Sequence, residues 1–182
     1  LSVFGKSIAN GYPLGVVGGR ASVMALFDSP DPSWGVALNG TFNPHPLTVA
    51  AALTTLSILQ REENAVYQRL EALGARLQKG LELVFAELDV TATVSRMGAA
   101  FCVYFCDHVP VDWHDLMTSH DFELDRCYRR ALLERGLYLF PLPCKQGSLS
   151  FAHTRKDIDK FVTATREILI TERNLAVRQL SA

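Results

Sequence analysis

A long amphipathic segment in the middle of the chain constrains the fold more than any other feature. Between Glu62 and Leu88, apolar residues recur at intervals of three and four, with charged residues between them. This stripe consists of Val66, Leu70, Leu73, Leu77, Leu81, Val84 and Leu88. Such spacing is typical of a helix that buries one face. The segment therefore predicts one long helix over 62–88.

The chain after this helix predicts a small α+β layer. Four apolar runs are expected as strands: 90–96, 99–106, 138–140 and 148–151. Between them, a polar and aromatic loop is expected over 107–120 and a helix over 122–135, ended by Gly136 at the usual C-terminal glycine position. Thr154, with Asp157 three residues later, is typical of a capping box that opens the last helix. These elements can cover the long helix and one another.

The chain before residue 60 has a different character. Residues 5–20 combine many Gly and Pro residues with apolar ones, which favours a structured loop after a strand end at Leu1–Phe4. A short helix is expected over 21–27, a second loop over 39–46, and a helix over 47–59 that is apolar on most sides and so expected to be buried. We predict an α/β organisation with two parts, 1–60 and 61–182.

Composition excludes several classes of partner. The 18 Lys and Arg against 19 Asp and Glu give a net charge of −1, with no basic block. Nucleic-acid and membrane-surface binding need a basic face, so we expect neither. The basic residues at 126–130 alternate with acids at helical spacing and predict a solvated helix face. The apolar stretches are too short for a transmembrane helix.

The cysteines indicate reduced thiols. Cys102, Cys106, Cys127 and Cys144 are too few and too scattered for a disulfide scaffold, which favours a cytoplasmic compartment. Cys102 and Cys106, followed by His108, His114 and His120, invite comparison with a zinc site, but no C-x2-C pair is present. Residues four apart on a strand share a face, so burial is the preferred interpretation and no metal site is expected.

The first residues carry the chemistry. The chain begins without Met, at a strand end that leads directly into the glycine-rich loop, so we expect it to be the C-terminal part of a longer polypeptide. Lys6 stands at that strand end, among glycines that allow close approach of a ligand. A lysine in a desolvated pocket has a lowered pKa, and its neutral amine can form a Schiff base. This arrangement suits a pyridoxal-phosphate (PLP) enzyme.

Three segments resemble one enzyme family. Residues 4–20, FGKSIANGYPLGVVGGR, resemble the cofactor-lysine segment of class III aminotransferases, which are fold type I PLP enzymes. Residues 40–53 are similar to that family's phosphate-contact loop and following helix. Residues 133–159 resemble the C-terminal domain of the glutamate-1-semialdehyde 2,1-aminomutase branch. The resemblance implies the C-terminal portion of the large PLP-binding domain over 1–60 and the small α+β domain over 61–182.

The resemblance also implies roles for particular residues. Lys6 would hold PLP as a Schiff base and then move the proton at the substrate Cα, while Gly40 and Thr41 would bind the phosphate. In this family the threonine reaches into the partner subunit's site, which implies a homodimer. The parts that hold the pyridine ring lie outside this chain, so the chain alone is expected to be incomplete as an enzyme. The substrate would be a small amino or oxo compound.

Several alternatives remain open at this stage. Three kinds of reaction start from the same cofactor–substrate adduct: amino transfer between two molecules, intramolecular transfer of the glutamate-1-semialdehyde type, and racemisation or decarboxylation. The alternative that is not an enzyme is a non-catalytic dimerisation fragment. Residues 148–154 lack the arginine that often binds an α-carboxylate in such transaminases.

Outside the motifs, structural roles are expected for Arg20 and His153, and an interface role is open for Trp34 and Trp113. Tyr138 and Phe140 are expected as core aromatics, with pocket walls as the alternative. Without its motif, Thr41 would be read as a turn cap.

Overall fold

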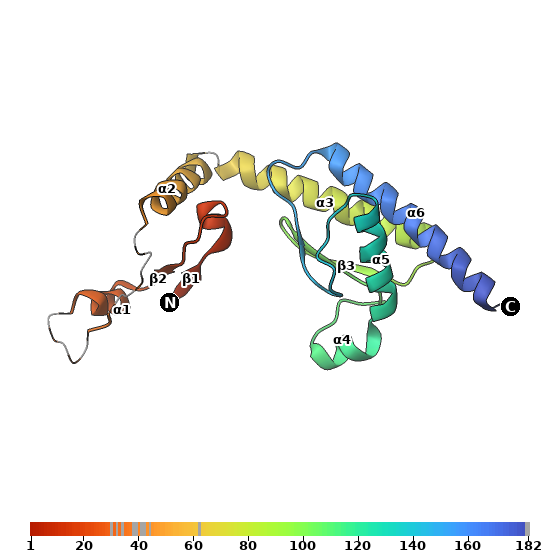
Figure 1. The fold of residues 1–182 in the computed structure, drawn as a ribbon, viewed down its shortest axis with the longest axis horizontal. Helices are drawn as coiled ribbons and strands as arrows, with labels where there is room; N and C mark the ends of the chain where they lie inside the picture. Colours follow the sequence, from red (N-terminus) through yellow and green to blue (C-terminus); the bar gives the residue numbers. More distant parts are fainter. Residues whose placement is uncertain are drawn as a thin grey trace. The chain divides into compact units, whose positions relative to one another are not determined.

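The chain forms two compact units, Leu1–Glu63 and Asn64–Ala182, which are described separately (Figure 1). The computed structural model describes residues 1–29, 31, 33, 35–37, 40, 43, 45–61 and 63–180. None of the helices in these ranges combines the length and apolar character needed to cross a membrane.

The first unit contains a short hairpin and a helix. β1 (Ser2–Phe4) pairs antiparallel with β2 (Val16–Gly18), and the loop between them holds the 3₁₀ helix η1 (Lys6–Ala9). α1 (Ala21–Met24) and the 3₁₀ helix η2 (Ala25–Asp28) follow. α2 (Pro46–Arg61) comes later and lies against η1. The strand before residue 5 and the helix at 47–59 are thus confirmed.

The burial predicted for α2 is wrong. Its buried residues are Thr48 and Ala52, whereas four large aliphatic side chains are exposed: Leu47, Leu53, Leu56 and Ile58. The physical reason is that α2 packs chiefly on the small 3₁₀ helix η1, which covers only one side of it. The remaining faces of α2 are therefore apolar and uncovered within the described unit.

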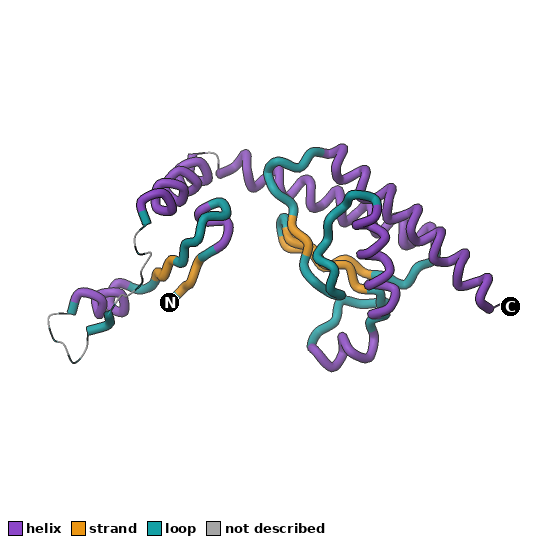
Figure 2. The backbone as a smooth tube through the Cα atoms, in the orientation of Figure 1, coloured by secondary structure: helices purple, strands orange, loops and turns teal. Residues whose placement is uncertain are grey.

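The second unit contains a three-stranded sheet. Helices accompany this sheet in the second unit (Figure 2). Its elements in chain order are α3 (Glu63–Leu88), β3 (Thr93–Met97), β4 (Ala100–Tyr104), α4 (Trp113–Ser119), α5 (Phe122–Glu134), β5 (Gly147–Ser148) and α6 (Arg155–Leu180). The sheet is antiparallel with the order β3-β4-β5. In its register Ser95 lies opposite Cys102, and Phe101 lies opposite Gly147.

The apolar stripe of the long helix forms the centre of the core, as its spacing predicts. Leu77 and Leu81 on α3 are 1% and 0% exposed, and they share one core cluster with Val103 of β4, Leu132 of α5 and Ile168 of α6. The predicted capping box is also confirmed. The Thr154 backbone N–H donates to Asp157 Oδ2 at 2.7 Å, and the Asp157 N–H donates to Thr154 Oγ1 at 3.4 Å.

Two local predictions are wrong. The expected loop 107–120 contains α4, which is capped by Asp112: its Oδ1 accepts a hydrogen bond of 2.9 Å from the Asp115 N–H. Residues 138–140 are not a strand, and 148–151 contributes only Ser148 to β5. The reason is that the carbonyl groups of Phe140 and Lys145 accept hydrogen bonds of 3.0 Å from the Arg129 side chain rather than from a neighbouring strand.

Candidate functional site

Lys6 occupies an unusual backbone conformation at the end of β1. Its φ is 53°, in the left-handed region that residues with a side chain seldom adopt. The turn after η1 repeats this conformation at Asn10, with φ 48°, and the Asn10 N–H donates to the Ser7 carbonyl at 3.0 Å. Non-glycine residues with positive φ cluster at functional sites. The Lys6 backbone is thus strained at the start of η1, where Gly5 alone separates it from β1.

The loop that carries Lys6 is anchored at both ends. The pairing of Phe4 with Val16 closes it, and Ala9, which is 0% exposed, fixes η1 beside α2. The Lys6 side chain itself is exposed, and it lines neither of the two cavities described below. The described residues therefore do not form the desolvated pocket expected around Lys6, because the helices and strands described in this unit leave its side chain exposed.

Gly40 lies in a tight turn with Asn43. The Asn43 N–H donates to the Gly40 carbonyl at 3.0 Å, and a Cβ on residue 40 would stand 2.9 Å from Asn43 Nδ2. A larger residue at position 40 would therefore require the exposed Asn43 side chain to move. Thr41, the second expected phosphate contact, lies outside the described residues.

These residues fit an aldehyde cofactor that carries a phosphate. A primary amine such as Lys6 Nζ is the group that forms a Schiff base with an aldehyde. Backbone close to a turn without a Cβ, as at Gly40, allows a phosphate to approach main-chain N–H groups. The donor set in the first unit thus agrees with the expected chemistry of its two loops.

The second unit contains a cavity of about 650 Å³ beside β5. Buried Phe101 and Leu139 line it together with Phe161, whereas Tyr138 and Phe140, which are 69% and 43% exposed, line it on the solvent side. The core role expected for these two aromatics is wrong, and the alternative, pocket walls, agrees with the structure. The cause is the irregular path of 138–146, which turns these rings away from the core.

A second cavity, of about 640 Å³, lies between α3 and the start of α6. It is lined by Arg69, Arg76 and Arg155 together with Thr154. Arg76 pairs with Asp159 at 2.7 Å. Arg69 donates to the His153 carbonyl and the Thr154 hydroxyl donates to Asp157, so three of these four side chains have structural partners.

His153 and Trp113 can be placed directly. The Ser150 N–H donates to His153 Nδ1 at 2.9 Å, and the His153 carbonyl accepts from Arg69 at 3.0 Å, in agreement with a structural histidine. Trp113 is 65% exposed at the start of α4, and Trp34 lies outside the described residues.

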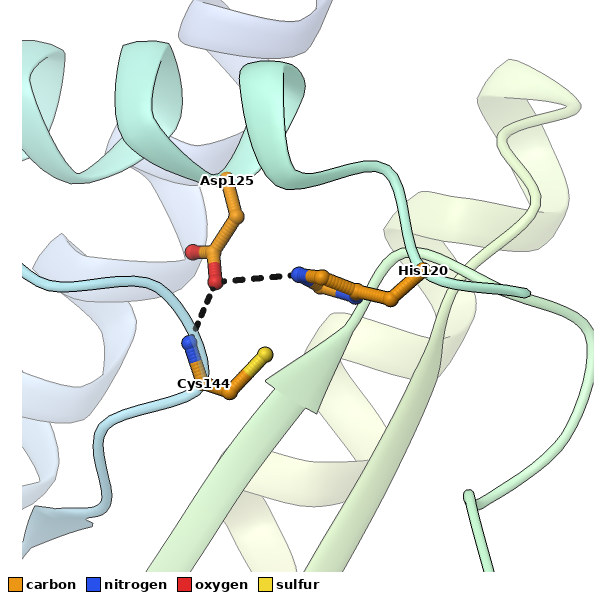
Figure 3. A group of neighbouring side chains, drawn as sticks. All are labelled: His120, Asp125 and Cys144. Atoms are coloured by element: carbon orange, nitrogen blue, oxygen red, sulfur yellow. Dashed lines mark hydrogen bonds and ion pairs between the residues drawn. The ribbon is translucent and has the colours of Figure 1, made fainter. Parts of the chain in front are cut away.

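A buried polar cluster in the second unit was missed by the sequence reasoning (Figure 3). Asp125 is 0% exposed, and its Oδ1 accepts from Arg129 Nε at 2.6 Å. Its Oδ2 accepts from the Cys144 N–H at 2.7 Å and from His120 Nε2 at 3.2 Å. Arg129 is 2% exposed, so it does not lie on the solvated face predicted for 126–130. The signal available was the i, i+4 spacing of Asp125 and Arg129.

The protonation state of His120 argues against a metal at this cluster. His120, Asp125 and Cys144 offer ligand atoms within 4.8 Å of one another. However, the Phe105 N–H donates to His120 Nδ1 at 3.0 Å, so the proton of the neutral ring is on Nε2, which donates to Asp125. No ring lone pair remains for a metal, and burial raises the pKa of the Cys144 thiol to about 12. The cluster is therefore structural: it joins α5 to His120 and to the loop at Cys144.

Comparison with known proteins agrees with the motifs of the first unit. The family described as aminotransferase class-III matches residues 1–159. A glutamate-1-semialdehyde 2,1-aminomutase from Desulfitobacterium hafniense is 37% identical over 169 residues, which are 93% of this chain and 38% of that protein. The chain thus spans about two fifths of the length of the relatives it matches.

Solved structures show the same fold. An omega-transaminase from Sphaerobacter thermophilus is 30% identical with a TM-score of 0.79, over 94% of this chain and 38% of that one. A glutamate-1-semialdehyde aminomutase from Pseudomonas aeruginosa PAO1, solved in complex with PMP, is 25% identical with a TM-score of 0.64, over 74% and 30%. The chain has the fold of part of a PLP-dependent transferase of fold type I, and it belongs to the class-III aminotransferase family.

Proposed function

We propose that this chain supplies the cofactor lysine of a PLP-dependent enzyme that moves an amino group to or from a small amino or oxo substrate. The observation that carries this proposal is Lys6 itself, a lysine with φ 53° that begins η1 one residue after Gly5 and β1, within the region matched by the family. Bound PLP would serve as the electron sink for the reaction. The chain covers 38% of the length of its aminomutase relative, so the proposal concerns the longer protein to which these residues would belong.

The residues of this chain have distinct tasks in that proposal. Lys6 Nζ would bind the cofactor aldehyde and later take and return the proton at the substrate Cα. The anchored ends of its loop, at Phe4 and Val16, limit where the amine can move. Gly40, and Thr41 beside it, would bind the phosphate. We further propose a large-domain portion over 1–60 and a small domain over 61–182, and the two compact units, whose boundary lies after Glu63, support this division.

The proposal includes a homodimer. Its support is the uncovered apolar surface of α2, where Leu53 and Leu56 are 61% and 45% exposed. Large exposed apolar patches mark interaction surfaces. The longer polypeptide would be measured by light scattering, and Leu53→Lys with Leu56→Lys is expected to lower the dimer fraction. A monomer at all concentrations in the unsubstituted protein would contradict the dimer.

Borohydride trapping tests the lysine. The longer polypeptide that contains these residues, purified with PLP, is expected to lose its imine absorption on reduction and to yield a pyridoxyl group on the peptide that contains Lys6. Lys6→Ala is expected to abolish this adduct, whereas Lys145→Ala, an exposed loop lysine of the second unit, keeps it. An adduct at another lysine, or no cofactor in the unsubstituted protein, would overturn the proposal and favour the dimerisation fragment.

Intramolecular transfer of the glutamate-1-semialdehyde type is the second candidate, favoured by the 37% identity to an aminomutase. The two are separated by the fate of the amino group. Single-turnover mixing of the PMP-loaded protein with an oxo compound would release an amino product in the aminotransferase. In the aminomutase the group returns to an adjacent carbon of the same molecule.

A further inference from the structure

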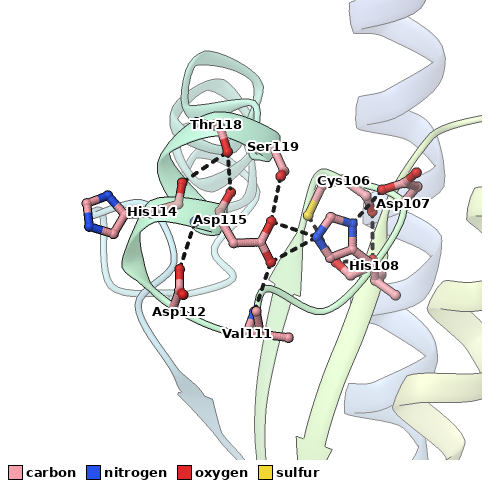
Figure 4. Close-up of polar contacts among 10 residues, drawn as sticks. Cys106, Asp107, His108, Val111, Asp112, His114, Asp115, Thr118 and Ser119 are labelled. Atoms are coloured by element: carbon pink, nitrogen blue, oxygen red, sulfur yellow. Dashed lines mark hydrogen bonds and ion pairs between the residues drawn. The ribbon is translucent and has the colours of Figure 1, made fainter.

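His108 lies between two carboxylates in the segment that joins β4 to α4 (Figure 4). Its Nδ1 is 2.6 Å from Asp107 Oδ1, and its Nε2 is 2.9 and 3.0 Å from the two carboxylate oxygens of Asp115. Ionised carboxylates only accept hydrogen bonds, whereas a neutral imidazole carries a single N–H. Both contacts exist together only when His108 is an imidazolium cation.

Asp115 connects this cation to the start of α4. Its Oδ2 also accepts from the Val111 N–H at 2.9 Å, and its Oδ1 accepts from Ser119 Oγ at 2.9 Å. Its own N–H donates to the cap residue Asp112 at 2.9 Å. One carboxylate thus joins the connecting segment, the first turn and the last turn of a seven-residue helix. α4 has no buried residues of its own, so these polar contacts account for much of its attachment.

We propose that His108 is a proton-dependent clasp, which holds segment 107–111 against α4 most firmly when the ring is charged and loosens its hold when the ring is neutral. Loss of either ring proton places a lone pair opposite a carboxylate, and repulsion replaces attraction there. Loss of the Nε2 proton opens the contact to Asp115 directly. Loss of the Nδ1 proton frees Asp107 and removes the positive charge from Asp115.

The surroundings of His108 set the direction of the pH response. Asp107 faces it from its own segment and Asp115 from α4. On the side of the sheet, the Thr93 hydroxyl and the Cys106 thiol both donate to the His108 carbonyl at 3.1 Å, and burial raises the pKa of that thiol, so neither carries charge at neutral pH. Hydrogen bonds to Asp107 and Asp115 raise the pKa of His108 above 6.5. The clasp is therefore closed below pH 6.5 and loosens as the pH rises through the raised value.

The test follows the ring and the helix in one titration. The full 182-residue chain is labelled with ¹³C-histidine and ¹⁵N, and its five histidines are assigned by single substitution. Between pH 5 and 10, the His108 ring signal is expected to titrate above 6.5, and the Val111 amide signal is expected to move with the same midpoint. In a Trp34→Phe background, Trp113 is the remaining tryptophan, and its fluorescence is expected to change at that midpoint as well.

Two substitutions provide matched controls. His108→Gln is expected to remove the transition from the Val111 and Trp113 signals. His114→Gln is expected to leave it unchanged, because His114 is an exposed histidine of α4 whose ring points away from the cluster (Figure 4). A His108 ring that titrates at or below pH 6.5, or Val111 and Trp113 signals that do not follow it, would overturn the clasp. The His108 ring signal and the Val111 amide signal are both measured in the unsubstituted chain, so these two signals decide the test even where a variant fails to fold.

Discussion

Gly80 of α3 lies directly against Val162 of α6. A Cβ on Gly80 would stand 2.7 Å from Val162 Cγ2, closer than non-bonded carbon atoms approach. The two 26-residue helices of the second unit therefore approach each other at a position where one of them has no side chain. At an exposed position of a helix, replacing glycine by alanine stabilises by about 0.5–1 kcal/mol. At this crossing the sign is expected to reverse.

Gly80→Ala is expected to lower the free energy of unfolding by about 1–3 kcal/mol, the usual cost of overpacking. Val162→Ala alone is expected to cost roughly 1–2 kcal/mol for the methyl groups removed. The double variant should be more stable than the sum of the two predicts, since the smaller residue makes room for the added Cβ. Urea unfolding of all four proteins measures this coupling, and strictly additive values would contradict the steric account.

Arg129→Met is expected to lower the free energy of unfolding by about 3–5 kcal/mol, because it leaves the Asp125 carboxylate buried without its cation. It also removes the donor to the Lys145 carbonyl, so limited trypsin digestion should cleave after Lys145 faster than in the unsubstituted chain. Arg130→Met is the control, since Arg130 is exposed and pairs with Glu134 at 3.1 Å. Equal trypsin rates for both variants would argue against the role of Arg129.

Asp89→Gly is expected to stabilise the chain by about 0.5–1 kcal/mol. Asp89 ends α3 with φ 52°, while the Val90 N–H donates to the Phe85 carbonyl at 2.9 Å. Gly136 ends α5 in the same way with φ 71°, so the molecule already uses glycine for this geometry once. The reciprocal change, Gly136→Ala, should destabilise by about 1 kcal/mol. Thermal unfolding by circular dichroism checks whether the two changes have opposite signs.

Asp115→Asn is expected to reduce the loss of unfolding free energy that occurs as the pH falls from 5 to 2. Hydrogen bonds from the Val111 N–H, His108 and Ser119 lower the pKa of Asp115 to about 2, below its ordinary value of 3.8. A carboxylate with a lowered native pKa adds stability that is present above 3.8 and is lost as the pH falls towards 2. Unfolding measured from pH 5 to 2 should therefore show a shallower loss in Asp115→Asn. Ser119→Ala, which removes one donor, should lie between the two proteins.

Cys144 is expected to resist alkylation in the folded chain. Burial is the main cause that raises its pKa to about 12, so its thiolate fraction at pH 8 falls roughly a thousandfold below that of an ordinary cysteine. Iodoacetamide labelling followed by peptide mass spectrometry should show slow modification of Cys144 in buffer and fast modification in urea. Fast labelling of the folded chain would show that the loop around Cys144 opens readily.

Periodic and capped elements were predictable from the sequence. The stripe that includes Leu77 and Leu81 predicted α3, and the pairing of Thr154 with Asp157 predicted the start of α6, because these signals depend on neighbours within one element. Gly136 predicted the end of α5 for the same reason. The family motifs around Lys6 likewise lie within continuous segments.

Features that depend on distant residues were not predictable. Residues 138–140 have the composition of a strand, but the Phe140 carbonyl accepts a hydrogen bond from Arg129 of α5 and not from a neighbouring strand. Arg129 itself resembled a solvated residue, because its burial depends on a loop that comes later in the chain and supplies the Phe140 and Lys145 carbonyl groups. The exposure of α2 depends on how little of it η1 covers. In each case the deciding partner lies in another element, which no local pattern records.

The contacts of Arg129 also show where the shape of one loop is encoded. The backbone between Phe140 and Lys145 is fixed from beneath by side chains of α5, Asp125 and Arg129, which bind its main-chain groups rather than its side chains. These contacts involve main-chain groups, so a change of the side chain at Phe140 or Lys145 leaves them in place. A protein engineer could therefore reshape the neighbouring cavity, which both of these side chains line, while the backbone keeps its path.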